Sequence, residues 1–120
     1  MKIWIDGAGA LIEGQRWKAV VVFEDGSYDK SEGPAIVTNN EAEYKALIHA
    51  LLDERAKDST IYTDSQLLVG QLTKGWKIKA ENLKGYVENA KPLLIIANAK
   101  LVWIPREQNK AGKLIEQNKN

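Results

Sequence analysis

The stretch Trp17-Lys-Ala-Val-Val-Val-Phe-Glu24, followed by Asp25-Gly26, decides how the fold begins. Its β-branched and aromatic residues predict a strand, and Asp25-Gly26 supplies the positive-φ pair that is favoured in a tight hairpin turn. Before it, Lys2–Asp6 reads as a shorter strand. After it, residues 27–37 return as a third strand, which is broken near Gly33-Pro34. Three consecutive antiparallel strands are therefore expected to open the fold.

Downstream of this hairpin, predicted helices alternate with strands. Thr38 and Glu41 have the spacing of a capping box, and apolar residues follow at helical spacing to about Ala56. A strand at Thr60–Thr63 follows, and then a helix that begins at an Asp64-Ser65 cap and runs to about Lys74. The next helix runs from Ala80 towards Ala97, and Pro92 should kink or break it. The last two elements are a strand at Leu101–Ile104, which Pro105 stops, and a terminal helix from Asn109 onward.

The element order is therefore βββαβααβα. Helices separate the first, fourth and fifth strands, so these strands should be parallel neighbours joined by right-handed crossovers. We expect an α/β fold, in which a mixed five-stranded sheet of three antiparallel and then two parallel strands carries helices packed on it.

Length and composition indicate one soluble domain over residues 1–120. The chain has 44% hydrophobic and 28% charged residues, which is typical of a globular protein and excludes a disordered one. It contains no cysteine, which excludes disulfides, thiolate metal sites and a thiol nucleophile. No apolar stretch is long enough to cross a bilayer, and the N-terminus lacks a signal-peptide pattern. We therefore expect a cytoplasmic protein.

The net charge of +1 conceals an asymmetry between two parts of the chain. Up to residue 73, seven Lys and Arg face twelve Asp and Glu, a balance of −5. From Lys74 onward, ten Lys and Arg face four Asp and Glu, a balance of +6. This asymmetry suggests a polyanion or a membrane surface as partner, whereas a solvated helix face is the alternative.

Three acids are expected to converge at one edge of the sheet. Asp6 closes the first strand and Asp64 closes its predicted parallel neighbour, and sites in open α/β sheets form beyond such strand ends. Glu43 lies on the inward face of the first helix. Because no Arg or Lys partner is obvious in the sequence, three carboxylates suggest ligands of a hard cation such as Mg²⁺.

Each acid also has a purely structural interpretation. Asp6 could belong to a strand-end turn with Gly7, Asp64 could be a helix N-cap, and Glu43 could be an acid favoured in the first turn of a helix. Spacing alone leaves both interpretations open.

Several motifs resemble the type 1 ribonuclease H family, in the same order along the chain. They are Ile5-Asp6-Gly7-Ala8, Thr38-Asn39-Asn40-Glu41-Ala42-Glu43-Tyr44-Lys45-Ala46-Leu47, Tyr62-Thr63-Asp64-Ser65-Gln66, residues 77–83 (KIKAENL) and residues 103–110 (WIPREQNK). The resemblance covers nearly the whole chain and implies the ribonuclease H fold. It also implies Mg²⁺-dependent hydrolysis of the RNA strand of RNA–DNA hybrids, which leaves 5′-phosphate and 3′-hydroxyl ends.

The resemblance also assigns roles to individual residues. Asp6 would bridge two Mg²⁺ ions about 4 Å apart, with Glu43 and Asp64 completing the ligand shells, and Glu43 would lie near the ribose 2′-hydroxyl. The residues expected to contact substrate are Gly7, Asn39, Asn40 and Gln66, together with Thr38 in a DNA-phosphate pocket and Trp76 in the DNA-strand channel. Trp76 could equally be an aromatic that covers the core.

The sequence departs from the family pattern in four places. The glycine-rich turn is shortened to Gly7-Ala8-Gly9 and Gly14, and no basic protrusion interrupts residues 76–83. The 105–108 loop carries no histidine, and the lone His49 lies inside the first helix, where we expect a spectator or a packed residue.

The fourth departure concerns the last carboxylate of the family. Its position is Lys113 here, or Gly112 if one residue is deleted, and Glu116 is a possible substitute ligand. A metal site with a missing ligand should be weak in Mg²⁺ and better served by Mn²⁺.

Three interpretations therefore remain. The first is a ribonuclease H that works as a monomer on RNA–DNA hybrids, without an organic cofactor or membrane partner. The second is a non-catalytic or weakly active hybrid-binding module of the same fold, and the third is a fragment of a larger nuclease.

Overall fold

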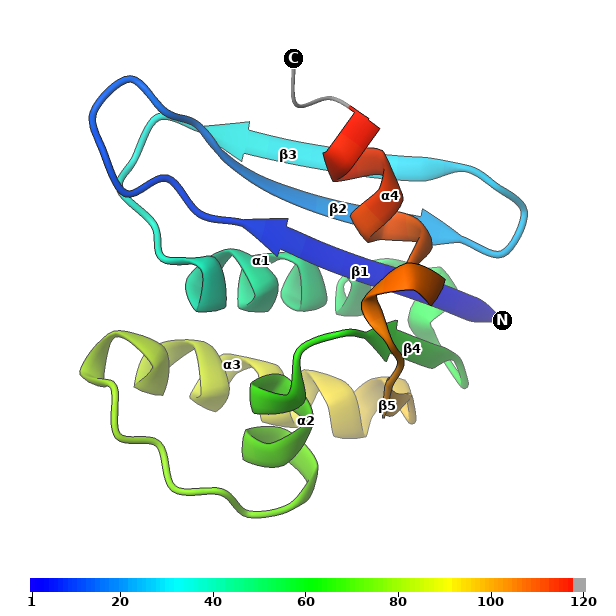
Figure 1. Cartoon of the computed structure of the whole chain (residues 1–120). Coiled ribbons are helices and arrows are strands. Elements are labelled where there is room, and N and C mark those ends of the chain that lie inside the picture. The colour runs from blue at the N-terminus through cyan, green and yellow to red at the C-terminus, as the bar shows by residue number, and fades with distance from the viewer. Residues whose placement is uncertain (118–120) are drawn as a thin grey trace.

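Five strands form one sheet in the order β3-β2-β1-β4-β5 in a computed structural model that describes residues 1–117 (Figure 1). The strands are β1 (Lys2–Ala8), β2 (Trp17–Phe23), β3 (Tyr28–Gly33), β4 (Thr60–Thr63) and β5 (Lys100–Trp103). β1, β2 and β3 pair antiparallel, whereas β4 pairs parallel with both β1 and β5. The predicted α/β fold with a mixed sheet is confirmed.

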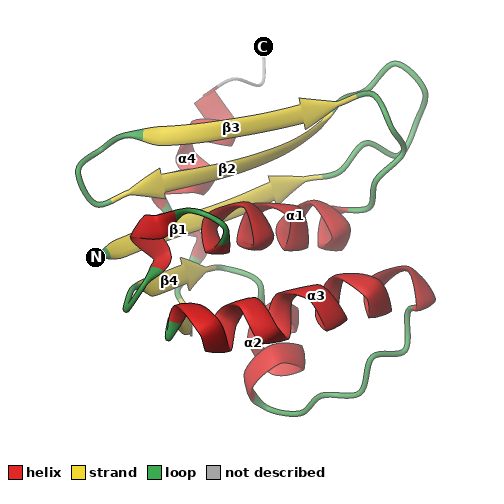
Figure 2. Ribbon diagram, turned by 180° about the vertical axis from the view of Figure 1, so that it is seen from behind, coloured by secondary structure: helices red, strands yellow, loops and turns green. Residues whose placement is uncertain are grey.

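Helices cover both faces of this sheet. The helices are α1 (Asn39–Leu51), α2 (Gln66–Thr73), α3 (Glu81–Ala97) and α4 (Lys110–Gln117). The first three lie on one face and α4 crosses the other, as the two opposite views show (Figures 1 and 2). None of the helices within residues 1–117 combines the length and apolar character that crossing a bilayer requires.

The alternation of side chains along β1 explains the two layers. Ile3 and Ile5 point into the larger core beneath α1, α2 and α3, whereas Trp4 points into a smaller core that includes Ala111 and Ile115 of α4. Because successive strand residues face opposite sides, Asp6 lies on the same side as Trp4. β1 therefore directs Asp6 towards the face that α4 covers.

The strands differ from the sequence prediction mainly at their ends. β1 continues two residues beyond Asp6 to Ala8, and β5 begins and ends one residue earlier than predicted. β3 ends at Gly33, so the break predicted near Gly33-Pro34 is where the strand stops, and only an isolated Ala10–Val37 bridge follows.

The helices contain two larger differences. α1 ends at Leu51 instead of about Ala56, and a separate 3₁₀ turn at Glu54–Ala56 follows, capped by Asp53. The predicted break at Pro92 is wrong, because α3 runs through it without interruption. Pro92 and Glu88, whose carbonyl would have accepted the missing hydrogen bond, are both exposed, so water can satisfy that carbonyl.

The parallel pairing of β1 with β4 places two of the predicted acids. Their ladder runs from Lys2↔Thr60 to Trp4↔Tyr62 and extends no further. Asp6 and Asp64 each come two residues after this last pair, near the carboxyl ends of β1 and β4. This is the edge at which open α/β sheets form their sites.

Candidate functional site

Three carboxylates meet at the carboxyl edge of β1 and β4. Asp6 is 1% exposed, Glu43 from α1 is 8% exposed, and Asp64 is partly buried. One carboxylate oxygen from each of the three lies within 4.8 Å of the other two. The convergence predicted from the sequence is therefore present in the fold.

The structural interpretations of these acids are not supported. β1 continues through Gly7 to Ala8, so no strand-end turn begins at Asp6. Ser65, not Asp64, caps α2, since its Oγ accepts a hydrogen bond from the Leu68 N–H at 3.2 Å. Glu43 is buried beside Asp6 instead of lying exposed in the first turn of α1. Asp64 and Glu43 are therefore free of the structural roles that could have explained them.

Burial dominates the electrostatics of the site. It raises the pKa of Glu43 well above its ordinary value, and the adjacent Asp6 carboxylate raises it further. Burial also raises the pKa of Asp6. Within residues 1–117, Asp6 Oδ1 and Glu43 Oε2 are buried without a hydrogen-bond partner. Buried carboxylate oxygens without a donor fit a cation, and oxygen ligands of this kind suit Mg²⁺ or Mn²⁺.

Arg106 also lies in this site, so the expectation that the acids lack an Arg or Lys partner is wrong. Its Nη1 donates to Asp6 Oδ2 at 2.8 Å and to Asp64 Oδ2 at 2.9 Å. Burial alone would lower the pKa of Arg106, but its bonds to Asp64 and Asp6 outweigh burial and raise that pKa. The guanidinium therefore carries a permanent positive charge at the carboxylates.

Asn109 is a second residue of the site to which the sequence assigned no role. Its Nδ2 donates to the Ile5 carbonyl at 2.9 Å and to Asp64 Oδ2 at 3.1 Å. Its Oδ1 accepts from the N–H groups of Ala111 and Gly112 at the start of α4. Asn109 is completely buried and therefore joins β1, Asp64 and α4 at one point.

The two positions considered for the fourth carboxylate lie on α4. A Cβ placed on Gly112 would lie 2.9 Å from Arg106 Nη1 and 3.4 Å from Asp6 Oδ2, so this position faces the site. Lys113 is exposed. Glu116, the possible substitute ligand, instead accepts from Arg106 Nη2 and Nε at 3.3 Å, so the guanidinium separates it from the acids.

Several residues that we expect at the substrate surface have structural roles at the start of α1. Thr38 is its N-cap and completes the predicted capping box with Glu41. Asn39 Oδ1 accepts the Gly9 N–H at 2.7 Å, and Asn40 is exposed. A Cβ on Gly7 would overlap the backbone of Ala42, so glycine is needed there for close packing of β1 on α1.

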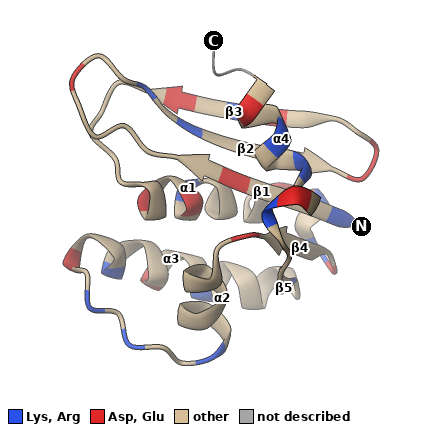
Figure 3. Ribbon diagram, viewed as in Figure 1, with Lys and Arg blue, Asp and Glu red and all other residues tan. Residues whose placement is uncertain are grey.

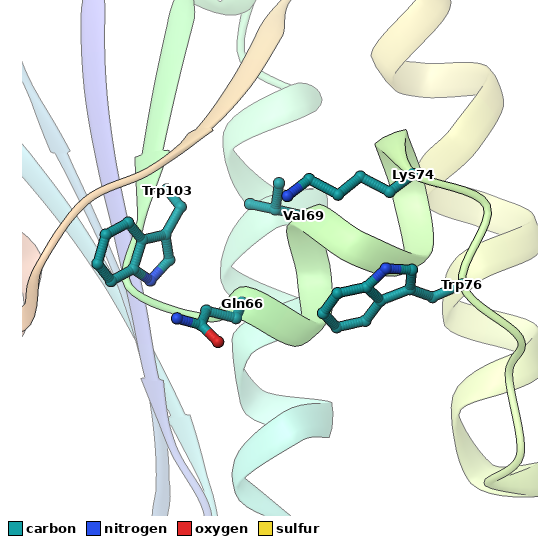
Figure 4. A pocket seen from close by; sticks show the side chains of 5 residues that line it. All are labelled: Gln66, Val69, Lys74, Trp76 and Trp103. Atoms are coloured by element: carbon teal, nitrogen blue, oxygen red, sulfur yellow. The ribbon is translucent and has the colours of Figure 1, made fainter.

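A hollow near Asp64 contains the other two predicted substrate residues, Gln66 and Trp76. It has a volume of about 250 Å³ and is lined by Gln66, Val69, Lys74, Trp76 and Trp103 (Figure 4). The Trp76 ring lies against Gly70 of α2, and Trp76 is 45% exposed. Trp103 Nε1 donates to the Asp64 carbonyl at 3.2 Å, which connects this hollow to the acidic site.

Basic residues gather on the side of this hollow that leads to α3. Figure 3 shows Lys and Arg positions along the segment between α2 and α3 and again at the turn before α4. The segment contains Lys74, Lys77 and Lys79, all of which are exposed. His49 lies elsewhere, exposed on α1, where its Nε2 is 3.4 Å from Asp29 Oδ2 of β3.

Sequence reasoning missed three residues of this region, namely Arg106, Asn109 and Trp103. All three stand in the Trp103–Lys110 motif, which carried the family resemblance but no assigned site role. Arg106 lies 100 residues from Asp6 along the chain, so only the path of the turn before α4 brings the two together.

Comparison with known proteins identifies relatives over most of the chain. A family model described as RNase H matches residues 1–110. EbsB of Enterococcus faecalis is 30% identical over 127 residues, which cover 96% of this chain and 90% of EbsB. Ribonuclease HI of Synechocystis is 33% identical over 92 residues, which cover 74% of this chain and 57% of that protein.

A solved structure shows the same similarity in three dimensions. LC11-RNase H1, isolated from compost, was solved in complex with an RNA/DNA hybrid and matches with a TM-score of 0.72 at 29% sequence identity. The match covers 94% of this chain and 91% of that one.

Proposed function

The chain belongs to the ribonuclease H family, and we propose that it hydrolyses the RNA strand of RNA–DNA hybrids with divalent metal ions. The products would carry 5′-phosphate and 3′-hydroxyl ends. The hybrid bound to LC11-RNase H1, which shares the fold at 29% identity, supports this class of substrate.

The observation that carries the proposal is the group formed by Asp6, Glu43 and Asp64. Three acids at one strand edge, two of them with buried oxygens that lack donors, are costly unless a cation is bound. Their position on β1, α1 and β4 of a ribonuclease H fold makes metal-assisted phosphodiester hydrolysis the best-supported chemistry.

The three carboxylates would hold the ions, which when bound activate a water and stabilise the charge on the leaving oxygen. Asp6 is fixed by β1 and by Arg106, and Asp64 is fixed by Asn109 and Arg106. Glu43 approaches from α1, so its carboxylate can also meet the ribose 2′-hydroxyl of an RNA strand at this edge.

Residues around the acids would hold the hybrid. Asn39 and Asn40 lie at the start of α1 and Gln66 at the start of α2, so all three can offer amides to a minor groove that passes over the acids. Trp76 and Lys74 in the neighbouring hollow offer an aromatic face and a positive charge to the DNA strand.

A non-catalytic hybrid-binding module is the second candidate, and one observation favours it. Gly112 and Lys113 supply no carboxylate, and Arg106 occupies two of the three acids. Fewer negative charges should weaken metal binding, so we propose low activity in Mg²⁺ and higher activity in Mn²⁺.

One experiment separates the two candidates. A hybrid with a labelled RNA strand is incubated with the protein in Mg²⁺, in Mn²⁺ and in EDTA, and binding is measured in EDTA. The enzyme should shorten the RNA only with metal, faster in Mn²⁺, and leave 5′-phosphate ends. Binding in EDTA without cleavage in either metal would favour the binding module.

A further inference from the structure

The guanidinium of Arg106 lies where a positive ion would be expected. It spans Asp6 Oδ2 and Asp64 Oδ2 through one nitrogen, at 2.8 and 2.9 Å. These acids come from β1 and β4, the same two strand ends that would hold a metal. A metal and Arg106 would therefore compete for the negative charge of the same two carboxylates, those of Asp6 and Asp64.

Gly112 makes this arrangement possible. The closest atoms to a Cβ built on Gly112 are Arg106 Nη1 at 2.9 Å and Cζ at 3.0 Å. Both distances are shorter than ordinary van der Waals contact, so a side chain on α4 at this position would push the guanidinium away. The absent side chain and the inserted guanidinium are thus two parts of one feature.

We propose that Arg106 is a displaceable counter-ion of the carboxylate site, held in place because residue 112 is glycine, and that divalent metal binds only as Arg106 withdraws. This inference rests on the proposed metal-dependent function. It assigns to Arg106 and Gly112 together the control of metal affinity.

The surroundings of Arg106 allow it to withdraw. Its side chain is 45% exposed, and its Nη2 and Nε already contact Glu116 on the solvent side at 3.3 Å. Asn109, the other donor to Asp64, is completely buried and bonded on both sides. Asn109 would therefore stay in place, whereas the guanidinium can pivot towards Glu116 when a cation takes its position.

The test measures Mn²⁺ binding by calorimetry, without nucleic acid, in the wild type, Arg106→Gln and Gly112→Ala. Arg106→Gln should raise Mn²⁺ affinity on the order of tenfold, because a unit positive charge leaves the carboxylates. Gly112→Ala keeps Arg106 but crowds it, so affinity should change in the same direction by a smaller factor.

Two variants serve as matched controls. Arg16→Gln removes an arginine from an exposed pair with Glu32 on the β2–β3 side of the sheet. Gly85→Ala adds a methyl group to α3 where, apart from its chain neighbours and the backbone of its own helix, no atom lies within 4 Å. It therefore gains helix propensity without touching the site. Both should bind Mn²⁺ as the wild type does.

The stability readout distinguishes a counter-ion from a merely structural arginine. In EDTA, Arg106→Gln should lower the melting temperature, because Asp6 and Asp64 lose the positive charge of the guanidinium. Saturating Mn²⁺ should restore the melting temperature to the wild-type value. A loss of the same size with and without Mn²⁺ would overturn the proposal.

The binding results have equally distinct meanings. Unchanged or weaker Mn²⁺ binding in Arg106→Gln would overturn the inference while leaving the metal-dependent function intact. Tighter binding in Arg106→Gln but not in Gly112→Ala would overturn the role of Gly112. Absence of Mn²⁺ binding in every variant would overturn both the inference and the proposed function.

Discussion

In the metal-free protein, ionisation of Glu43 lowers the free energy of unfolding more than ionisation of the other acids at the site. Burial and the neighbouring Asp6 raise its pKa above the ordinary 4.5, so the folded protein holds this proton more tightly than the unfolded chain does. The stabilising effect of that proton is fully present below about pH 4.5 and is lost as the pH rises through the raised pKa.

Glu43→Gln should therefore stabilise the metal-free protein at pH 8 and have little effect near pH 4.5. We expect a gain of about 1 kcal/mol or more at pH 8, since one unit of pKa shift corresponds to about 1.4 kcal/mol. Urea unfolding in EDTA at both pH values measures the difference, and a gain that does not depend on pH would contradict this account.

Glu41→Gln provides the matched control on the same helix. Burial would raise the pKa of Glu41, but its hydrogen bonds to Thr38 outweigh burial and lower that pKa. Removing its charge should thus cost stability at pH 8, the opposite sign to Glu43→Gln.

The position of the missing carboxylate can be tested on α4 directly. The Cβ direction of Gly112 points at Asp6 and Arg106, whereas Lys113 is exposed. Gly112→Asp should therefore raise Mg²⁺-dependent cleavage several-fold, because it adds a ligand and gives Arg106 another acid to pair with. Lys113→Asp should change it little, and the reverse order of effects would show that the helix register at the site is different.

The three acids of the site could be predicted from the sequence, whereas the arginine that pairs with two of them could not. Asp6 and Asp64 end predicted strands and Glu43 lies on a predicted inward face, so local patterns were enough to place them. Arg106 follows a proline in a short segment without periodicity, and its direction depends on a 3₁₀ turn and on a glycine six residues later.

At the scale of elements, Asn109 fastens α4 to the edge of the sheet. Its Oδ1 accepts hydrogen bonds from the N–H groups of Ala111 and Gly112 in the first turn of α4. Its Nδ2 donates to the Ile5 carbonyl on β1 and to Asp64. Asn109→Ala should cost about 2–4 kcal/mol, from a lost cap and a buried carbonyl left without a donor.

Ser65→Ala is the comparison for Asn109→Ala. Ser65 caps α2 through a single bond to Leu68 N–H, so its loss should cost only about 1 kcal/mol. Chemical denaturation of both variants measures the difference, and equal losses would show that Asn109 is no more than a helix cap.

The elements themselves were largely predictable, with errors where tertiary context outweighs local rules. The capping box at Thr38 predicts the start of α1 correctly. The spacing of apolar residues predicts the end of the helix too late, because this spacing continues into the 3₁₀ turn at Glu54–Ala56. Pro92 was expected to kink or break a helix that packs through Leu83, Val87 and Ala90 on one side and leaves Pro92 on the exposed side. Packing and solvent access, which decide such cases, are not local properties of the sequence.

At the scale of the whole molecule, part of the positive charge of the second part of the chain lies on one surface near the acids. Lys74, Lys77 and Lys79 lie between α2 and α3, next to the hollow beside the acids. If these lysines neutralise phosphates, replacing all three with Gln should weaken hybrid binding in EDTA. The slope of log affinity against log salt should also become shallower by up to about 3 units.

Lys2, Lys57 and Lys100 form the control set for this experiment. They lie at or just before the amino ends of β1, β4 and β5, opposite the edge that carries the acids. Replacing all three with Gln changes the net charge equally but should leave most of the salt slope intact. If the two triple variants have equal effects, the basic segment contributes to hybrid binding only through the net charge of the protein.

The central claim is that the carboxylates of Asp6, Glu43 and Asp64 carry out metal-dependent cleavage of RNA in hybrids. The most direct measurement is the cleavage rate of a hybrid with a labelled RNA strand by Asp6→Asn, beside the wild type and Asp29→Asn, in Mn²⁺. Asp29 is a partly exposed acid on β3 that pairs with His49, so it controls for the loss of one charge. We predict that Asp6→Asn stays folded and loses on the order of 10³-fold or more in rate, whereas Asp29→Asn cleaves as the wild type does. A folded Asp6→Asn variant that cleaves the RNA strand as fast as the wild type would contradict the account.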